Sequence, residues 1–372
     1  MVPTNHFSRG SLCLFIGVAF EFLCLHVRAE QIPVLKDSVS VPAVFNVHYS
    51  SFDECVYYTT RPGSSSGATY RLEADNTSTL LYSGSTPPSG LTVDPNDGDV
   101  FISEDHPGNV RRILNNGSAH SVWVSGFGSV EDDDPAGLLI VPDYFTGTIA
   151  SPGDAFVADR GWGESEQLFS FSKDSAEGEV ELLAFERQEG LFDIVAADDV
   201  IVLVEYGQGL QLLVESNGTY SLQLVPMTPS LTQVSAACWD NLRKRMYLAA
   251  TDPSTGSNIV AVFDPYSGTA STLLTGFSSL GWGSLSISTD FSELYVADHG
   301  AGELRSYILP YPSSFSTEPH AHGANTGWIH FAPSDLNGVV VHESYLSGYA
   351  HCANTGWMKF GEGSPLNGYR FT

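Results

Sequence analysis

The residues of this chain best suited to chemistry are acids, arginines, histidines and tryptophans that directly follow short apolar segments. These segments have the length and composition of β-strands, so the polar residues fall in loops at strand ends, where binding residues are often found. We expect them to share one surface. The candidate ligand-binding residues on that surface are Arg61, Asp105, His106, Asp159, Arg160, Trp162, Asp252, Trp282, Asp298 and His299.

Some of these acids could hold a metal ion. Carboxylate oxygens are the ligands that Ca²⁺ and Mg²⁺ prefer. We therefore predict a divalent cation, Ca²⁺ or Mg²⁺, bound by Glu104, Asp159 and Asp298. The alternative is structural, because an aspartate at a strand end can accept hydrogen bonds from the amides of its own loop.

A second group of candidate ligands is a set of histidines near the end of the chain: His320, His322, His330, His342 and His351. Imidazole is a ligand for zinc and copper. The spacing is irregular, however, and no paired cysteines accompany the histidines. Both a metal site and a set of structural or surface histidines remain open.

A weak repeat supplies the elements that must position the first group. Its unit is an apolar segment, a tight turn and a second apolar segment ending in polar residues, and two more strands follow. The first two strands of each unit span residues 43–60, 90–105, 137–160, 191–207, 234–251 and 283–298. The pattern predicts an all-β fold, a six-bladed β-propeller; a β-sandwich or a parallel solenoid is the alternative.

The last unit lacks a fourth strand, and residues 31–41 form an unassigned strand-like segment that could supply it. Pairing of the two ends of the chain would close the ring. In such a ring, the loops between second and third strands share one face with the links between blades. The candidate ligand-binding residues would then meet around a central channel.

Two segments carry a family resemblance: LTVDPNDGDVFISEDHPGNVRRIL and SISTDFSELYVADHGAGELRSYIL. They resemble the repeat of six-bladed NHL propellers and, more distantly, of the gluconolactonase and strictosidine-synthase-like superfamily. The resemblance covers about residues 31–310. It implies the propeller fold and, for the lactonase-type members, a metal that polarises a carbonyl and aligns water for hydrolysis.

A different repeat follows the Pro/Ser-rich residues 311–320. AHGANTGWIHF (321–331) returns as AHCANTGWMKF (350–360), with eight of eleven positions identical. The pattern predicts two small β-hairpins, each burying its tryptophan, and it resembles Gly-Trp repeats of exported bacterial proteins. We divide the chain into a signal peptide (1–29), a propeller (30–310), a linker (311–320) and two Trp-containing β repeats (321–372).

The N-terminal residues and the charge bear on compartment and partners. Residues 1–29 combine Arg9, an apolar run and small residues before a cleavage point after Ala29, as in a secretory signal peptide. We expect a secreted, periplasmic or cell-envelope protein without a membrane span in the mature chain. A formal net charge of −27 argues against nucleic acid as a partner. Cys55, Cys238 and Cys352 could all be free thiols, or two of them could form one disulfide.

No nucleophile or phosphate-binding motif assigns a catalytic residue. Residues 63–67 match G-x-S-x-G in letters only, because a nucleophile elbow requires a strand-to-helix turn. We therefore expect a ligand- or protein-binding module for an extracellular or envelope partner, with a divalent cation at the channel mouth as an added feature. The alternatives are a metal-dependent hydrolase of lactones or esters and a structural component of the cell envelope.

Overall fold

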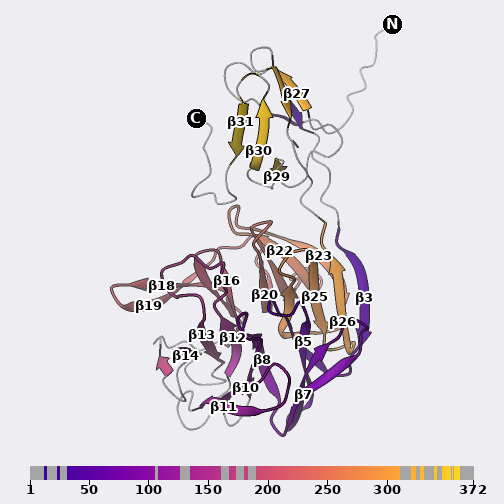
Figure 1. Cartoon of the computed structure of the whole chain (residues 1–372), viewed down its shortest axis with the longest axis vertical. Coiled ribbons are helices and arrows are strands. Elements are labelled where there is room, and N and C mark those ends of the chain that lie inside the picture. The colour runs from indigo at the N-terminus through magenta and orange to yellow at the C-terminus, as the bar shows by residue number, and fades with distance from the viewer. Residues whose placement is uncertain are drawn as a thin grey trace. The chain divides into compact units, whose positions relative to one another are not determined.

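The structure is a computed structural model that describes residues 12–14, 23–25, 32–104, 108–125, 135–160, 167–172, 180–182, 190–310, 320–323, 327–330, 339–341, 346–352, 354 and 356–360. These residues form strands, turns and loops, so within them no helix has the length and apolarity needed to cross a membrane. The chain divides into two compact units. One spans Pro33–Leu309, and the other combines Met1–Ile32 with Pro310–Thr372 (Figure 1).

The described part of Pro33–Leu309 forms six four-stranded antiparallel sheets. Blades 1 to 3 contain β4 (Val44–Tyr49), β5 (Val56–Gly63), β6 (Ser66–Leu72) and β7 (Ser78–Gly84); β8 (Pro88–Val93), β9 (Val100–Glu104), β10 (Asn109–Ile113) and β11 (His120–Ser125); and β12 (Pro135–Ile140), β13 (Asp154–Asp159), β14 (Gln167–Ser172) and β15 (Val180–Leu182).

The remaining three sheets follow in chain order, and the last one includes a strand from the other end of the unit. Blades 4 to 6 contain β16 (Leu191–Ala197), β17 (Val200–Glu205), β18 (Gly209–Ser216) and β19 (Thr219–Leu224); β20 (Thr232–Asp240), β21 (Arg245–Thr251), β22 (Asn258–Asp264) and β23 (Thr269–Phe277); and β24 (Leu280–Ile287), β25 (Glu293–Asp298), β26 (Glu303–Ile308) and β3 (Val34–Ser40).

The sheets close into a ring. The first strand of each blade contacts the first strand of the next, and β24 of the last blade contacts β4 of the first. The N-terminal strand β3 pairs with β26, from Val34 opposite Ile308 to Ser40 opposite Glu303 (Figure 1). The predicted six-bladed propeller is therefore confirmed, and so is its closure by the N-terminal strand.

Alternating side chains hold neighbouring blades together. In β17, Ile201 and Leu203 pack toward blade 3, whereas Val202 and Val204 pack toward blade 5. Successive residues of a strand point to opposite faces of its sheet, so a strand between two sheets must be apolar on both faces. Each of the six interfaces between adjacent blades contains one such apolar cluster among the described residues.

The other unit holds the two C-terminal repeats. Its described strands are β1 (Leu12–Leu14), β2 (Leu23–Leu25), β27 (His320–Gly323), β28 (Gly327–His330), β29 (Val340–Val341), β30 (Leu346–Cys352) and β31 (Gly356–Phe360). β27 and β28 form one antiparallel hairpin, β30 and β31 form the other, and β28 pairs with β30. The predicted hairpins are confirmed.

The predicted burial of both tryptophans is wrong for the second repeat. Trp357 is 61% exposed, whereas Ala350 and Cys352 on the neighbouring strand are fully buried. The repeat thus turns its small residues inward and its indole outward. The side chain of Trp328 lies outside the part of the chain whose side chains are described.

Candidate functional site

The first strand of every blade is irregular at the same end. In each blade its pairing with the second strand shifts register close to its first residues, which is the signature of a β-bulge. Bulges re-aim side chains next to binding sites. The shifts lie between Val44 and Val47, Pro88 and Gly90, Pro135 and Leu138, Leu191 and Asp193, Thr232 and Ala236, and Leu280 and Leu285.

The second strands end beside these bulges. Asp159 ends β13 opposite Pro135, and Asp298 ends β25 opposite Leu280. We call this end of the ring, where first strands begin and second strands end, the mouth face. The candidate residues that end second strands therefore share one end of the ring with the bulges.

Trp282 is the residue on which the mouth face converges. Its indole lies 5.5 Å from the Phe45 ring and 4.7 Å from the Phe192 ring, measured between centroids. The guanidinium carbon of Arg160 lies 4.4 Å from the centre of the indole, and that of Arg61 lies 5.7 Å from it. Residues of blades 1, 3 and 4 thus meet a side chain of blade 6.

Glycines make room for this arrangement. Gly283 adopts a φ of +57°, and a Cβ there would lie 2.7 Å from Nδ2 of Asn46. A Cβ at Gly190 would lie 2.7 Å from the Phe192 ring and 3.0 Å from Cγ of Arg160. A side chain at either position would displace neighbouring atoms, and at Gly283 it would also strain the backbone.

Asn46 fixes the backbone around the indole. Its Nδ2 donates hydrogen bonds to the carbonyl of Trp282 (2.7 Å) and to that of Ser89 (3.0 Å), and its Oδ1 accepts one from the Thr59 hydroxyl (2.8 Å). The side chain is buried, so these bonds satisfy its amide. One amide thereby ties blades 6, 1 and 2 together next to Trp282.

Further aromatic and cationic groups border the indole. The Arg61 guanidinium also lies over Phe45 (5.3 Å), and the His299 ring meets Phe45 edge-on at 5.7 Å. Nδ1 of His299 is 2.9 Å from the Val44 carbonyl, which can only accept, so that nitrogen carries the proton. Tyr206, half exposed, lies 5.1 Å from Phe192. We call Phe45, Asn46, Arg61, Arg160, Phe192 and Trp282 the mouth cluster.

The acids predicted as metal ligands have other partners. Glu104 accepts hydrogen bonds from the Tyr82 hydroxyl (2.9 Å) and from both Nε and the terminal nitrogen of Arg111 (3.0 and 2.9 Å). Asp298 accepts from the amides of Ser278, Ser279 and Ala301 and forms an ion pair with Arg305 (3.0 Å). Asp159 is buried at the end of β13.

The predicted cation site therefore does not fit. Within the described residues, no three histidine, cysteine or acidic side chains lie close enough together to hold a metal ion. Glu104, Asp159 and Asp298 therefore do not form such a group. The physical reason is that Arg111 and Arg305 already neutralise two of the carboxylates inside their own blades. Asp252 likewise accepts from the amide and hydroxyl of Ser254 in its own turn, and these bonds lower its pKa.

The other candidates are divided between the cluster and undescribed residues. The structure brings Arg61, Arg160 and Trp282 together and places His299 beside them. Asp105, His106 and Trp162 lie outside the described residues. Sequence reasoning missed Phe45, Asn46 and Phe192, because each lies in an apolar segment that reads as core.

Removing the Asp298 carboxylate should destabilise the propeller. We expect Asp298→Ala to lower the free energy of unfolding by about 1–3 kcal/mol, because three loop amides and Arg305 lose their acceptor. Asp252→Ala is the control, and it should have little effect because its turn is exposed to water. Denaturant titration measures both; a wild-type midpoint for Asp298→Ala would contradict the capping role.

Comparison with known proteins identifies the fold but does not assign the chain to a family. No family model and no curated protein matches the sequence. A gluconolactonase from Xanthomonas campestris is similar in structure, with 12% identity, a TM-score of 0.56 and coverage of 76% of this chain and 99% of that chain. A protein of unknown function from Bacteroides thetaiotaomicron has 10% identity, a TM-score of 0.54 and coverage of 74% and 72%.

A third similar structure is the hydrazine synthase of Kuenenia stuttgartiensis, with 11% identity, a TM-score of 0.52 and coverage of 74% of this chain and 79% of that chain. At such low identity the likeness extends to the fold alone, and fold does not fix function. The chain has the fold of a β-propeller.

Proposed function

We propose that the chain is an exported binding module that captures a ligand at the mouth cluster. The observation that carries this proposal is the convergence of four blades on Trp282, with two guanidinium groups and two phenyl rings around one indole. A propeller needs no such group at its axis for stability, since its interfaces are filled by apolar clusters. Export rests on the predicted signal peptide in residues 1–29.

The cluster favours a ligand that carries a carboxylate next to a sugar or aromatic ring. A guanidinium that stacks on an aromatic ring keeps its N–H donors in its own plane, which suits two-pronged hydrogen bonds to a carboxylate. The guanidinium carbons of Arg61 and Arg160 both lie over the Trp282 ring. The half-exposed ring of Tyr206 beside Phe192 offers a surface on which a sugar or aromatic ring can stack.

The other predicted functions have less support. A metal-dependent lactone or ester hydrolase needs oxygen ligands at the mouth, and those of Glu104 and Asp298 are engaged by arginines and loop amides. A purely structural envelope component would not require two arginines at the axis. Binding therefore stands as the proposal that the geometry supports best.

A panel of small acids tests it. Benzoate and galacturonate are each compared with an uncharged counterpart, benzamide and galactose, by isothermal titration against the purified chain. We expect the acids to bind and their counterparts to bind at least about tenfold more weakly, because a hydrogen bond to a charged group contributes about 1.5–3 kcal/mol. Arg61→Gln and Arg160→Gln should each weaken binding of the acids by a similar factor.

Arg112→Gln is the matched control. Its guanidinium also lies over aromatic rings, Phe101 at 5.7 Å and Trp123 at 4.9 Å, but it pairs with Asp99 in the turn between the first two strands of blade 2. Affinity in this variant should equal that of the wild type. Equal binding of acids and neutral counterparts, or equal losses in all three arginine variants, would contradict the proposal.

A further inference from the structure

Three short segments of the chain have the sequence that accepts an N-linked glycan. The pattern is Asn-x-Ser/Thr, with any residue except proline in the middle. It occurs at 76–78 (Asn-Thr-Ser), 116–118 (Asn-Gly-Ser) and 217–219 (Asn-Gly-Thr), and nowhere else in the 372 residues. A pattern this short also arises by chance, so the position of each match in the fold must be considered.

All three segments occupy the same kind of turn. Asn76 lies between β6 and β7 of blade 1, Asn116 between β10 and β11 of blade 2, and Asn217 between β18 and β19 of blade 4. Each turn joins the third strand of its blade to the fourth. Because these strands are antiparallel, such turns lie at the end of the ring opposite the mouth face. All three asparagines are exposed there.

The side-chain nitrogen of each asparagine can take a new covalent bond. Oδ1 of Asn116 accepts from the Ser118 amide (2.9 Å), which engages the side-chain oxygen and not the nitrogen that a glycan would join. Nδ2 of Asn76 donates to Asp37 (2.7 Å), and a glycosylated amide keeps one N–H for that bond. Asn217 lies at the tip of the β18–β19 hairpin, which projects from the ring (Figure 1). A glycan at any of these positions leaves the blade intact.

Turn geometry explains only part of the pattern. Asparagine is common in tight turns because it tolerates a positive φ, as it does at two of these sites. A turn does not require a hydroxyl two residues later. The hydroxyl of Ser78 also accepts from Tyr58 (2.6 Å), so it has a structural use. Ser118 and Thr219 are exposed, and the turn imposes no hydroxyl at either position.

We propose that Asn76, Asn116 and Asn217 carry N-linked glycans in the exported chain. In this reaction Nδ2 bonds to the anomeric carbon of a sugar that the host supplies as a lipid-linked diphosphate. The bond from that carbon to the phosphate oxygen breaks, the lipid diphosphate leaves with the electron pair, and the amide releases one proton to solvent. The inference rests on export, which is part of the proposed function.

The glycans would divide the propeller into a covered end and an open end. N-linked glycans are bulky and hydrophilic. Three of them on blades 1, 2 and 4 would cover much of the end opposite the mouth face. None of the three segments lies on the mouth face, so the mouth cluster stays accessible to its ligand.

Secretion of the full chain, including residues 1–29, from cultured eukaryotic cells tests the three sites. Peptide-N-glycosidase releases an N-linked glycan and converts its asparagine to aspartate, so digestion in heavy-oxygen water marks each occupied site for mass spectrometry. We expect all three asparagines of the secreted chain to be marked. Asn76→Gln, Asn116→Gln and Asn217→Gln should each remove one step from the shift in electrophoretic mobility that digestion produces.

Thr219 provides the matched control, because it can be changed without altering the asparagine. Thr219→Ala should abolish the glycan at Asn217, whereas Thr219→Ser keeps the hydroxyl and should retain the glycan. Thr219 is exposed, so both variants should fold as the wild type does. A glycan at Asn217 that persists in Thr219→Ala would contradict the assignment.

The remaining outcomes separate this inference from the proposed function. An asparagine that stays unmodified in the secreted chain would overturn the proposal for that site. A chain retained in the cytosol without glycans would overturn export and the glycan sites together. Neither result would affect ligand capture at the mouth cluster, which titration of the purified chain measures independently.

Discussion

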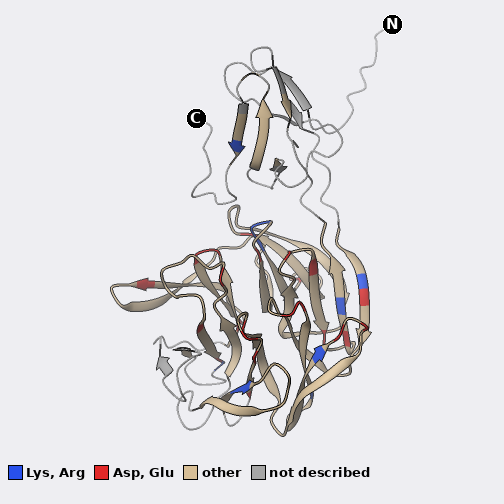
Figure 2. Cartoon of the chain, viewed as in Figure 1, with Lys and Arg blue, Asp and Glu red and all other residues tan. Residues whose placement is uncertain are grey.

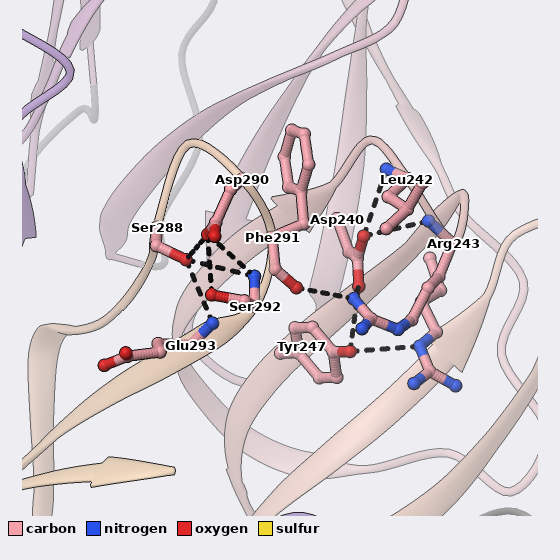
Figure 3. A network of polar contacts seen from close by, with 10 residues as sticks. Asp240, Leu242, Arg243, Tyr247, Ser288, Asp290, Phe291, Ser292 and Glu293 are labelled. Carbon is pink, nitrogen blue, oxygen red and sulfur yellow. Dashed lines mark hydrogen bonds and ion pairs between the residues drawn. The ribbon is translucent and has the colours of Figure 1, made fainter. Parts of the chain in front are cut away.

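Replacing Asp240 by alanine is expected to lower the free energy of unfolding by about 3–5 kcal/mol, the cost of breaking a buried ion pair from one side. One carboxylate oxygen of Asp240 accepts from the amides of Leu242 and Arg243, and the other accepts from the Arg243 guanidinium (2.7 Å) and the Tyr247 hydroxyl (2.9 Å) (Figure 3). All of these side chains except Leu242 are buried.

The cost is high because the variant removes a buried carboxylate that accepts from the Arg243 guanidinium. Arg243 also donates to the Phe291 carbonyl (2.8 Å) in the next blade, so the guanidinium stays at this position after the carboxylate is lost. Burial raises the pKa of Tyr247, which therefore stays protonated and loses its acceptor. The network links the turn of blade 5 to that of blade 6 (Figure 3).

Asp290→Ala provides the control. Asp290 occupies the corresponding turn of blade 6 and is exposed; among the described residues it accepts from Ser288 and Ser292 and from no cation (Figure 3). We expect its loss to cost about 1 kcal/mol or less. Denaturant-induced unfolding of the three proteins measures the difference, and equal losses in both variants would show that the buried ion pair has no special role.

The second large effect concerns the pH dependence of stability. Two residues on the innermost strands should change the free energy of unfolding in opposite directions as the pH changes. Burial raises the pKa of Asp193 on β16 to about 7 and lowers the pKa of His48 on β4 to about 4. Both side chains keep some accessible surface, but the surrounding sheets exclude most of the water that would hydrate a charge. Asp193 accepts from the amides of Ala237 and Ile194, and these bonds lower its pKa by less than burial raises it.

The two groups act in opposite directions. The stability contributed by protonated Asp193 is complete below pH 4 and is lost as the pH rises to 7, a change of roughly 4 kcal/mol. The stability contributed by neutral His48 is complete above pH 6.5 and is lost as the pH falls to 4, a change of roughly 3 kcal/mol. In the wild type the two changes largely cancel between pH 4 and 6.5.

Single variants should reveal each dependence. The stability of Asp193→Asn relative to the wild type should increase by roughly 4 kcal/mol between pH 4 and pH 8, and that of His48→Asn should increase by roughly 3 kcal/mol from pH 7 down to pH 4. Urea titrations at each pH give both differences. A constant difference across this range would contradict the assignment for that residue.

Much of the fold was predictable because the strands of one propeller blade are close together in the sequence. Each blade consists of consecutive strands with short turns, so the period along the chain carried the architecture. The long-range closure was also predictable, since residues 31–41 were left over where blade 6 lacked a strand. The exposure of Trp357 was not predictable in this way. Residues alternate between the two faces of β31, but the sequence does not tell which face is buried. In the structure the buried face is the one that carries Ala350 and Cys352, so Trp357 lies on the exposed face.

The mouth cluster was only partly predictable. Arg61, Arg160 and Trp282 could be assigned to one face from their place after strands. Phe45 and Phe192 could not, because a bulge that turns one apolar residue of a strand toward the axis leaves no mark in composition. The bulges were visible only in the pairing register.

The arginine partners of two predicted metal ligands left a signal in the sequence. In two blades an arginine follows the acid seven residues later, Arg111 after Glu104 and Arg305 after Asp298. The acid at the end of the second strand and the arginine on the third strand are diagonal neighbours on the same face of the sheet. Acids and bases thus neutralise each other within blades, although acids greatly outnumber bases in the chain (Figure 2).

A double-mutant cycle between Arg160 and Trp282 tests most directly whether distant blades converge at the mouth. The two residues belong to blades 3 and 6, and the guanidinium carbon lies 4.4 Å from the indole centre. For Arg160→Ala, Trp282→Ala and the double variant, we predict a coupling of about 0.5–2 kcal/mol in the free energy of unfolding. Losses that add within about 0.3 kcal/mol would mean that the two side chains do not meet and would contradict the site.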